Sequence, residues 1–416
     1  MKASSPMLRF RDDRKNEFPN WQRTNLGALT KWASGGTPSK ANPTFWDGDI
    51  PWISAASMHE RHYCDSPTKI TMAGLRSGSK ITAKGTILLL VRGSMLWNRI
   101  PVGIAERDLA FNQDVKALNP SENLLNKYLL QWFIAFENLL LHKVVGTGIG
   151  AGKLETDEMK ELPFMLPSLP EQRKIANFLS SVDKRIEQLT QKKSLLEQYK
   201  KGAMQQIFSQ QIRFKDDCGG DFPDWEEKKL GDVVERFSSG ATPFRGKPDY
   251  YTGDIKWISS GELNYNTIYE TNEHISEQAR TQTNLRIHPP ETFLMAITGL
   301  EAAGTRGSCA MTGVAATTNQ SCMAIYPNEL LRADFLFQWY RHFGERLAFR
   351  YCQGTKQQSY TAGILKIVPI SLPRNLDEQT KIANFLSALD RKIETVASQI
   401  AEMQTFKRGL LQQMFV

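Results

Sequence analysis

The sequence predicts a mixed α/β (α+β) protein with two similar globular domains in tandem, each followed by a long helix. The two helices are expected to form an antiparallel coiled coil with pseudo-twofold symmetry. Two observations predict this: the chain repeats itself once, and each copy ends in apolar residues spaced alternately by four and three. With 416 residues, of which 41% are hydrophobic, the chain is long enough for two domains with real cores. No apolar run reaches the ~18 residues of a membrane span.

The repeat has an offset of 207 residues in its best-matched part. Residues 171–187 (EQRKIANFLSSVDKRIE) and 378–394 (EQTKIANFLSALDRKIE) are identical at 12 of 17 positions. Upstream, the two copies share short motifs separated by stretches that differ, which indicates one unit duplicated in tandem. The paired motifs are FPNW (18–21) and FPDW (222–225), SGGTP (34–38) and SGATP (239–243), GDIPWIS (48–54) and GDIKWIS (253–259), TILLLVRG (86–93) and TFLMAITG (292–299), Asn112-Gln113 and Asn319-Gln320, and KGAMQQIF (201–208) and RGLLQQMF (408–415).

Each near-identical segment has the pattern of a long helix. Ser168 and Glu171, like Asn375 and Glu378, have the spacing of a capping box at the helix start. The apolar spacing that follows predicts a coiled-coil seam, and a helix of about 38 residues spans roughly 57 Å. The simplest partner of each helix is the other one. The seam residues are Ile175, Leu179, Val182, Ile186, Leu189 and Leu196 in the first copy, and Ile382, Leu386, Leu389, Ile393, Val396, Ile400 and Met403 in the second.

Lysines interrupt this seam at equivalent places. Lys200 and Lys407 occupy seam positions, and Lys193 stands where the other copy has Ile400. A lysine in an apolar seam lowers its stability. We therefore expect the lower half of the helix pair to open or to meet another partner.

The part of each copy before the helix predicts a mixed α/β domain of about 150 residues in which strands dominate. Short apolar runs such as TILLLVR and TFLMAIT are typical of buried strands, as are IPWIS and IKWIS. Residues 124–143 and 330–350 have the composition of helices. Because fixed motifs alternate with variable stretches, we expect the two domains to share a fold and to bind different targets.

The charge balance permits a nucleic-acid partner without demanding one, since 52 Lys and Arg against 44 Asp and Glu give a net charge of +8. Basic and amide side chains in loops can bond to base edges and phosphates. The strand-end loops 92–99 and 298–306 are equivalent but differ in sequence, as do GTGIGAGK (146–153) and GTKQQSY (354–360). Such differences suit two sites of different specificity. The candidate DNA-binding residues are Lys40, Arg61, Arg76, Arg92, Arg99, Lys153, Arg245, Lys247, Arg286, Arg306, Lys356, Gln357 and Gln358.

Motifs of common catalytic sites are missing. GTGIGAGK resembles a phosphate-binding loop, but its glycines are one residue too far apart and Leu154 follows the lysine. Asn42-Pro43-Thr44-Phe45 lacks the second proline of the NPPF tetrapeptide of amino-methyltransferases. The five cysteines form no CxxC pair and the six histidines have no metal-ligand spacing. We therefore expect no catalytic residue and no metal site, and a chain that binds while catalysis occurs elsewhere.

Together these features resemble the specificity subunit of Type I restriction–modification systems. The resemblance rests on two variable domains, each followed by EQxKIANFLSxxDxxIE and [KR]GxxQQxF, and on SGGTPSK and FWDGDIPWIS near the start. It covers essentially the whole chain. It implies four regions: a first target recognition domain at 1–162, a central conserved helical spacer at 163–212, a second target recognition domain at 213–369 and a C-terminal conserved helical spacer at 370–416.

The resemblance also implies a function. Each target recognition domain would read one half of a split double-stranded DNA sequence, and the helices would fix the gap between the halves. The chain would bind no cofactor itself: S-adenosylmethionine would bind to two modification subunits that methylate adenine N6, and ATP and Mg²⁺ to two restriction subunits. The complex would act in the cytoplasm of a bacterium or archaeon, without a membrane partner, in host defence against phage. Because the two domains differ, the DNA site is expected to be asymmetric.

Two other classes of protein stay open at this point. A self-contained DNA enzyme would methylate or cleave DNA as a purified single chain. A coiled-coil adaptor without DNA binding would tolerate charge reversal at Arg92 and Arg306.

Overall fold

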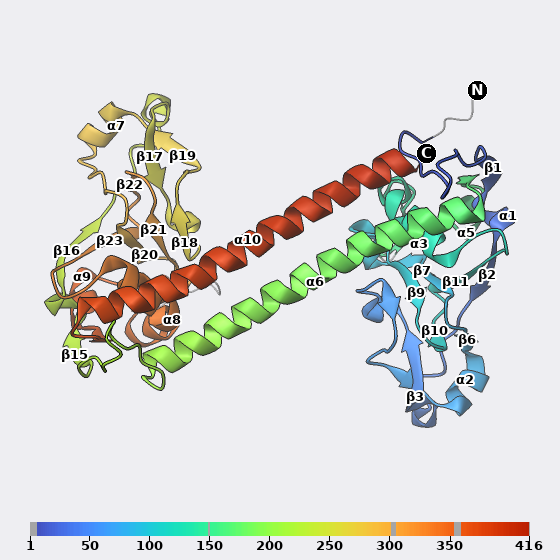
Figure 1. The fold of residues 1–416 in the computed structure, drawn as a ribbon, viewed down its shortest axis with the longest axis horizontal. Coiled ribbons are helices and arrows are strands. Elements are labelled where there is room, and N and C mark those ends of the chain that lie inside the picture. Colours follow the sequence, from blue (N-terminus) through green and yellow to red (C-terminus); the bar gives the residue numbers. More distant parts are fainter. Residues whose placement is uncertain (1–5, 149, 301–304, 353–358, 416) are drawn as a thin grey trace. The chain divides into compact units, whose positions relative to one another are not determined.

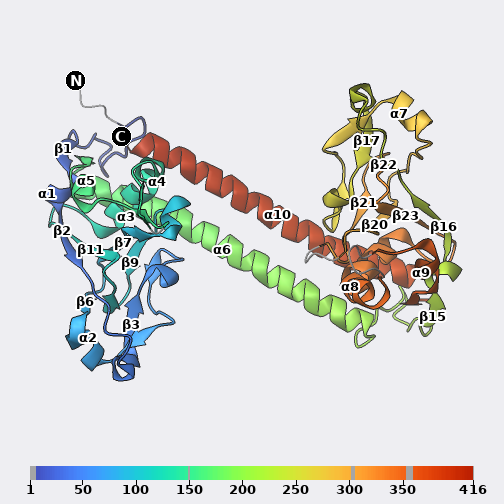
Figure 2. The same ribbon diagram turned by 180° about the vertical axis from the view of Figure 1, so that it is seen from behind.

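The apolar runs predicted as buried strands form the centre of a five-stranded sheet in each copy of the repeat. The computed structural model describes residues 6–148, 150–300, 305–352 and 359–415. Contacts divide the chain into two units, Met1–Gln191 with Ala397–Val416 and Lys192–Val396. Each unit thus contains one globular domain, about half of the long helix that follows this domain in sequence and about half of the other long helix (Figure 1, and from behind in Figure 2).

In the first unit the main sheet has the order β2-β11-β7-β9-β4, and a smaller sheet has the order β5-β3-β10-β6. All four residues of β7 are fully buried, because this strand lies at the centre of the main sheet. The elements are β1 Gln22–Asn25, α1 Leu26–Leu29, β2 Thr30–Ser34, β3 Trp46–Ile53, β4 His62–Tyr63, β5 Lys69–Ile70, α2 Met72–Gly78, β6 Lys80–Thr82, β7 Ile87–Leu90, β8 Arg92–Gly93, β9 Val102–Ala105, β10 Leu109–Phe111, β11 Val115–Pro120, α3 Asn126–Ala135, α4 Glu137–Leu141, β12 Val145–Gly146, β13 Gly152–Lys153, α5 Thr156–Lys160, β14 Pro163–Leu166 and the long helix α6 Leu169–Phe208, which continues into the second unit.

The second unit repeats the order of the main sheet, and its smaller sheet has three strands where the first unit has four. Its main sheet has the order β16-β23-β20-β21-β18 and its smaller sheet β19-β17-β22, so the predicted strands TFLMAIT and IKWIS take the same places as their counterparts. The shared fold is therefore confirmed. The elements are β15 Glu226–Lys229, β16 Val234–Ser239, β17 Ile255–Ile258, β18 Asn266–Ile268, β19 Glu273–Ile275, α7 Glu277–Gln282, β20 Phe293–Ala296, β21 Cys309–Thr312, β22 Thr317–Thr318, β23 Cys322–Pro327, α8 Ala333–Tyr351, α9 Ala362–Ile367, β24 Pro369–Leu372 and α10 Leu376–Met414, whose end belongs to the first unit.

The motifs common to both copies form the same junction twice. A Cβ atom on Gly35 would lie 2.1 Å from the carbonyl oxygen of Phe111, and one on Gly240 would lie 1.9 Å from that of Thr318, so only glycine fits at either place. Trp52 lies in the GDIPWIS motif, and its indole N–H donates at 3.1 Å to the carbonyl of Gly36, the residue after Gly35 in SGGTP. The equivalent bond joins Trp257 and Ala241 at 3.1 Å. The repeated motifs therefore hold the frame of each domain together, which explains why they differ so little.

The helix starts are held by buried side chains, and here the predicted capping boxes are wrong. Glu171 is fully buried and accepts hydrogen bonds from the guanidinium of Arg9 at 2.9 and 2.8 Å and from the indole of Trp21 at 3.0 Å. Glu378 accepts in the same way from Arg213 at 3.2 and 3.0 Å. Only Asn375 caps its helix with its side chain, by accepting from the backbone N–H of Asp377. The two glutamates thus tie each helix to the segment before the domain rather than to its own first turn.

The next residue of each motif completes this attachment. The Gln172 side chain accepts from the N–H of Leu125 at 2.9 Å and donates to the carbonyls of Asn123 and Pro167 at 2.8 and 2.9 Å. Gln379 makes the equivalent three bonds in the second unit. Both amides are fully buried, and each joins the start of a long helix to the start of a shorter one, α3 or α8.

The two long helices pack antiparallel within each unit, as predicted. In the first unit the N-terminal part of α6 shares one apolar core with the end of α10, through Leu179 and Leu410 among others. In the second unit the start of α10 shares one apolar core with the end of α6, through Leu386 and Ile207 among others. The predicted seam residues are buried or half-buried.

The expectation that the seam opens at its lysines is wrong. Lys407 forms an ion pair with Asp183 at 2.5 Å, and Lys200 forms one with Asp390 at 2.5 Å. Both lysine side chains are largely buried, with 13% and 7% of their surface exposed. Burial and the nearby Arg341 lower the pKa of Lys200 to about 8. The lysines therefore join the two helices instead of separating them.

Helix 124–143 is interrupted, unlike its counterpart. The chain forms α3 and α4 with a break at Phe136, whose ψ of 14° departs from the helical value, whereas α8 runs unbroken from Ala333 to Tyr351. The predicted spacer boundaries at 163 and 370 fall on β14 and β24, which pair with β1 and β15 in the globular domains. The helices themselves begin at Leu169 and Leu376. Among the described residues, no helix is both long and apolar enough to cross a membrane.

The two seam lysines provide a matched test. Asp183 accepts from Lys407 and from the neutral amide of Gln131, whereas Asp390 also binds Arg341 at 2.6 Å. Lys407→Met leaves a half-buried carboxylate without a cation, so we expect the free energy of unfolding to fall by about 1–3 kcal/mol. Lys200→Met leaves Arg341 in place and removes a lysine that is costly to bury, so we expect a loss below about 1 kcal/mol. Urea unfolding followed by circular dichroism measures both, and a larger loss for Lys200→Met would contradict this account.

Candidate nucleic-acid interface

Two loops that the sequence singled out separately lie side by side in the first unit. Strand β13 pairs antiparallel with both β8 and β12, so that Lys153 lies opposite Arg92 and Gly152 lies opposite Gly93. The loop after the central strand and the glycine-rich loop therefore make one small three-stranded sheet. We call residues 92–99, 145–148 and 150–153 the first paired-loop surface.

The second unit brings its equivalent loops together in the same manner. Thr298 forms an isolated β-bridge with Ser359, and the N–H of Tyr360 donates to the carbonyl of Ile297 at 2.8 Å. We call residues 298–300, 305–306 and 359–360 the second paired-loop surface. The candidates Lys356, Gln357 and Gln358 lie outside the described residues. Both units thus bring together two loops that differ in sequence between the copies, on a frame that the copies share.

The candidate cations of the first unit fall into two groups. Arg92, Lys40 and Arg76 are exposed, and their side chains have no hydrogen bond or ion pair to any other described residue. The guanidinium of Arg99 donates to the carbonyls of Met58 and His59 at 2.6 and 3.1 Å. The first group keeps its hydrogen-bonding capacity for a ligand, whereas Arg99 supports the protein itself. Two further candidates have partners: Arg61 donates to the carbonyl of Val102 and lies 3.9 Å from Glu137, and Lys153 pairs with Glu155 at 2.6 Å.

In the second unit most candidates already have partners. Arg245 forms a bidentate pair with Glu273 and lies over the rings of Tyr251 and Trp257, at 4.4 and 5.1 Å from their centroids. The carboxylate of Glu273 raises the pKa of Arg245 further. This arginine therefore builds the domain. The remaining candidates are Lys247, which donates to the hydroxyl of Tyr250, Arg306, which lies 4.2 Å from the ring centroid of Phe349, and Arg286, which is exposed.

Two cysteine thiols and one imidazole of the second unit are buried. Burial raises the pKa of the thiols of Cys309 and Cys322, so both stay protonated near neutral pH. Burial also lowers the pKa of His288 to about 4, so its imidazole is neutral. In the described part of the chain, no three His, Cys, Asp or Glu residues are grouped to hold a metal ion. The surfaces described above are suited to binding an anion through exposed cations.

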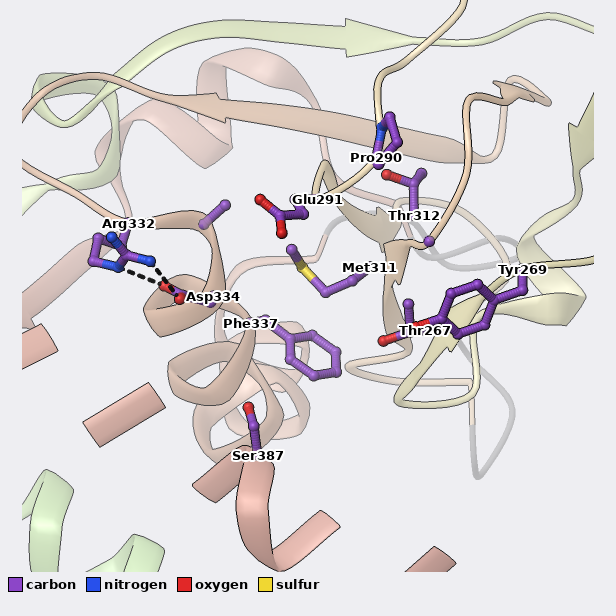
Figure 3. A pocket seen from close by; sticks show the side chains of 12 residues that line it. Thr267, Tyr269, Pro290, Glu291, Met311, Thr312, Arg332, Asp334, Phe337 and Ser387 are labelled. Atoms are coloured by element: carbon purple, nitrogen blue, oxygen red, sulfur yellow. Dashed lines mark hydrogen bonds and ion pairs between the residues drawn. The ribbon is translucent and has the colours of Figure 1, made fainter. Parts of the chain in front are cut away.

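Each unit has a groove where its shorter helix, α3 or α8, begins. In the second unit it has a volume of about 520 Å³ and lies where α8 begins, with Phe337, Ser387 and Tyr269 in its wall. Arg332 and Asp334 form a bidentate ion pair at its edge (Figure 3). In the first unit a groove of about 370 Å³ is lined by Leu124–Lys127 and by Arg173, Ala176 and Asn177 of α6. Residues 125–127 correspond to 332–334 in the repeat, so the two grooves adjoin the same helix start. The other walls differ, since the larger groove extends over β18 and β21 and the smaller one over α6.

Two features of these surfaces were missed from the sequence. Arg9 and Arg213, which hold the buried glutamates, belong to a further repeated motif, RFRDD (9–13) and RFKDD (213–217). Trp97 is 49% exposed within the first paired-loop surface. The repeat would have revealed the first feature. The only signal for the second is a tryptophan in a loop of basic and glycine residues.

Comparison with known proteins identifies relatives. The model of the Type I restriction modification DNA specificity domain matches residues 19–198 and 223–405. The specificity subunit of the type I restriction enzyme EcoR124I/EcoR124II from Escherichia coli is 32% identical over 38% of this chain and 40% of its own length. The MjaIX specificity subunit from Methanocaldococcus jannaschii is 25% identical over 67% of this chain and 66% of its own. These two alignments span less than two thirds of the relatives, whereas the MjaVIII specificity subunit, at 22% identity, is covered over 91% of its length.

Solved structures share the fold. The S subunit of a Type I restriction-modification system from M. genitalium superposes with a TM-score of 0.64 at 16% identity, over 99% of both chains. A chain from a study of complex assembly and conformational transition in the type I R-M system gives a TM-score of 0.54 at 16% identity, over 96% of this chain and 98% of the other.

The exposed side chain of Arg92 provides a test of DNA binding by the first paired-loop surface. Arg92→Ala removes one cation that has no partner in the described structure, so we expect weaker binding of duplex DNA to the full chain. The slope of log Kd against log salt concentration should become shallower by about 0.9. Arg14→Ala removes the same charge from the exposed turn 12–16 and serves as the control. A slope that changes equally in both variants would show that net charge alone matters.

Proposed function

Because the chain belongs to the family of Type I restriction modification DNA specificity domains, we propose that it is the DNA-recognition subunit of a Type I restriction–modification complex. It binds one bipartite site in double-stranded DNA and places the enzymes of the complex there. It has no catalytic role of its own. The complex acts in the bacterial or archaeal cytoplasm.

The observation that carries this proposal is the same frame built twice with different loops. The order of the main sheet, the glycine–carbonyl contacts and the tryptophan bonds are equivalent in the two units. The paired-loop surfaces differ: Arg92 and Lys153 face each other in the first, while Arg306 lies over Phe349 in the second. Base edges are read by the side chains that reach them, so two different surfaces read two different half-sites. The DNA site is therefore asymmetric.

The long helices act as the spacer. Each is attached to a domain by a buried glutamate and glutamine, and the two are joined by ion pairs in the seam. Such attachments resist rotation of a helix about its axis, because every bond depends on the side-chain direction. A spacer of this kind fixes the gap between the half-sites, and two short sequences at a fixed gap are far rarer in a genome than either alone.

The partners follow from the same duplication. Two modification subunits carry S-adenosylmethionine and methylate adenine N6, and two restriction subunits use ATP and Mg²⁺. None of these cofactors binds to this chain. The same domain frame and the same attachment of a long helix in each unit support one modification subunit per unit, a stoichiometry that native mass spectrometry of the purified complex measures.

Methylome sequencing tests the function. Cells that express this chain with its neighbouring modification gene should show methylated adenines in a split, asymmetric motif, and the motif should vanish when the gene for this chain is deleted. A motif that is palindromic or undivided would contradict recognition by two different domains. Methylation that persists unchanged in the deletion would remove this chain from DNA recognition altogether.

Lengthening both helices tests the spacer. We would insert seven residues after Gln191 in α6 and after the equivalent Ser398 in α10, because one whole heptad keeps the seam in register. Each helix gains about 10 Å, so the gap should widen by about three base pairs while both half-sites stay the same. The same seven residues inserted after Gly219, in an exposed turn with positive φ, form the control. A gap that stays constant in the lengthened variant would refute the spacer.

A further inference from the structure

Trp97 occupies an unusual place on the first paired-loop surface. It ends the short 3-10 helix Ser94–Trp97 that follows β8. Its neighbour Leu96 is fully buried in the core of the domain, whereas Trp97 is 49% exposed. Leu96 thus anchors the turn from below and Trp97 projects from it. Exposing a ring of this size to water costs free energy, so the position demands an explanation.

The indole is held in place although it is exposed. Its N–H donates to the carbonyl of Gly150 at 3.1 Å, and a Cβ atom on Gly146 would lie 3.8 Å from the ring. Gly150 has a φ of +80°, a conformation in which glycine is unstrained. A Cβ on Gly152 would lie only 2.7 Å from the Val144 side chain. The glycine-rich loop, which at first resembles a phosphate-binding loop, thus serves as the seat of the ring.

The surroundings of the ring are cationic. Arg92 and Lys153 lie opposite each other on the adjoining strands β8 and β13. Lys153 is paired with Glu155, whereas the side chain of Arg92 has no partner among the described residues. The second unit also presents an aromatic ring on a basic surface, since Phe349 of α8 is 64% exposed and Arg306 lies over it. An exposed aromatic ring on the same loop as an exposed arginine fits duplex DNA, where phosphates flank the apolar faces and methyl groups of the bases.

We propose that Trp97 contacts the bases of one half-site and determines part of its sequence, while Arg92 holds the flanking phosphate. This inference rests on the proposed DNA-recognition function and goes beyond it by naming a residue that discriminates bases. Phosphate contacts position a protein without reading sequence. An indole ring carries no charge, so its contribution to affinity depends on the base that it touches and hardly on salt. The two residues therefore have separable effects.

The experiment uses the assembled complex with its modification subunit and a DNA duplex that carries the motif found by methylome sequencing. Trp97→Ala should weaken binding by about tenfold or more, in the range of other aromatic–base contacts, with an unchanged salt slope. Trp97→Phe lacks the N–H but keeps a ring, so it should retain most of the affinity. Leu139→Ala, which removes a 46% exposed apolar side chain from α4, is the matched control.

Substitution of each base in both half-sites then locates the contact. In the alanine variant one or two positions of a single half-site should become degenerate, and the other half-site should keep its full specificity. Duplexes with uracil in place of thymine separate the two kinds of apolar contact: loss of discrimination with uracil assigns the thymine methyl group, and its persistence assigns the base face. Both results support the proposal.

Two results would overturn it. Specificity and affinity that are unchanged in Trp97→Ala would show that the ring touches no base. Equal weakening at both half-sites, together with a similar loss in Trp97→Phe and a lower melting temperature, would mean that the indole N–H only braces the loop. Absence of any split motif with the wild-type chain would instead refute the proposed function, so the two failures are distinguishable.

Discussion

The buried Glu-Gln pair at the start of each long helix is the attachment on which the architecture depends. Glu171 and Gln172 are fully buried and between them bind Arg9, Trp21 and the backbone at the start of α3. A buried carboxylate is tolerated only when cations and donors surround it, and removing a partner is far more costly than the pair is worth. This makes the attachment specific in direction rather than merely adhesive. The bonds of Glu171 and Gln172 fix the direction in which α6 leaves its own domain.

The near-identity of the two helices has a physical reason in this arrangement. Each unit needs the first half of one helix and the second half of the other. Asp183 in the first half must meet Lys407 in a second half, and Asp390 must meet Lys200. Every helix therefore contacts both domains, and a change at one end has to fit the partner half as well. The described bonds of the loop residues, such as those from Trp97 to Gly150 and from Thr298 to Ser359, lie within one domain. A change in such a loop does not have to fit the other domain.

The sequence predicted the parts of the fold that depend on local periodicity and repetition. The central strands follow from short apolar runs and the seam from apolar spacing of four and three, while the antiparallel pairing follows from the duplication of the chain. The structure has all three. The errors concern polar side chains whose partners are distant in sequence. Glu171 has the spacing of a capping residue but binds Arg9, 162 residues away, and Lys407 finds Asp183 across the seam. Spacing along one helix contains no information on such partners.

The same limit applies to the candidate interface. The sequence located the variable loops, and the structure shows that they meet in pairs. The sequence could not separate Arg92, whose exposed side chain has no partner among the described residues, from Arg99 and Arg245, whose guanidinium groups bind Met58 and Glu273. All three are arginines in loops. Trp97 was not predicted either, because sequence alone does not distinguish an exposed tryptophan from one that packs in the core.

The separation of frame and loops lets stability and specificity change independently. The frame residues Gly35, Trp52 and their counterparts are in close contact with backbone atoms, so their replacement strains the domain. Exposed side chains such as Arg92 and Trp97 contribute little to the core, and surface substitutions of this kind usually alter stability by less than about 0.5 kcal/mol. A base contact of the strength discussed above is worth about 1–3 kcal/mol of discrimination. A loop substitution can therefore change the recognised base by more than it changes the fold, and the unchanged helix keeps the new half-site at the old distance.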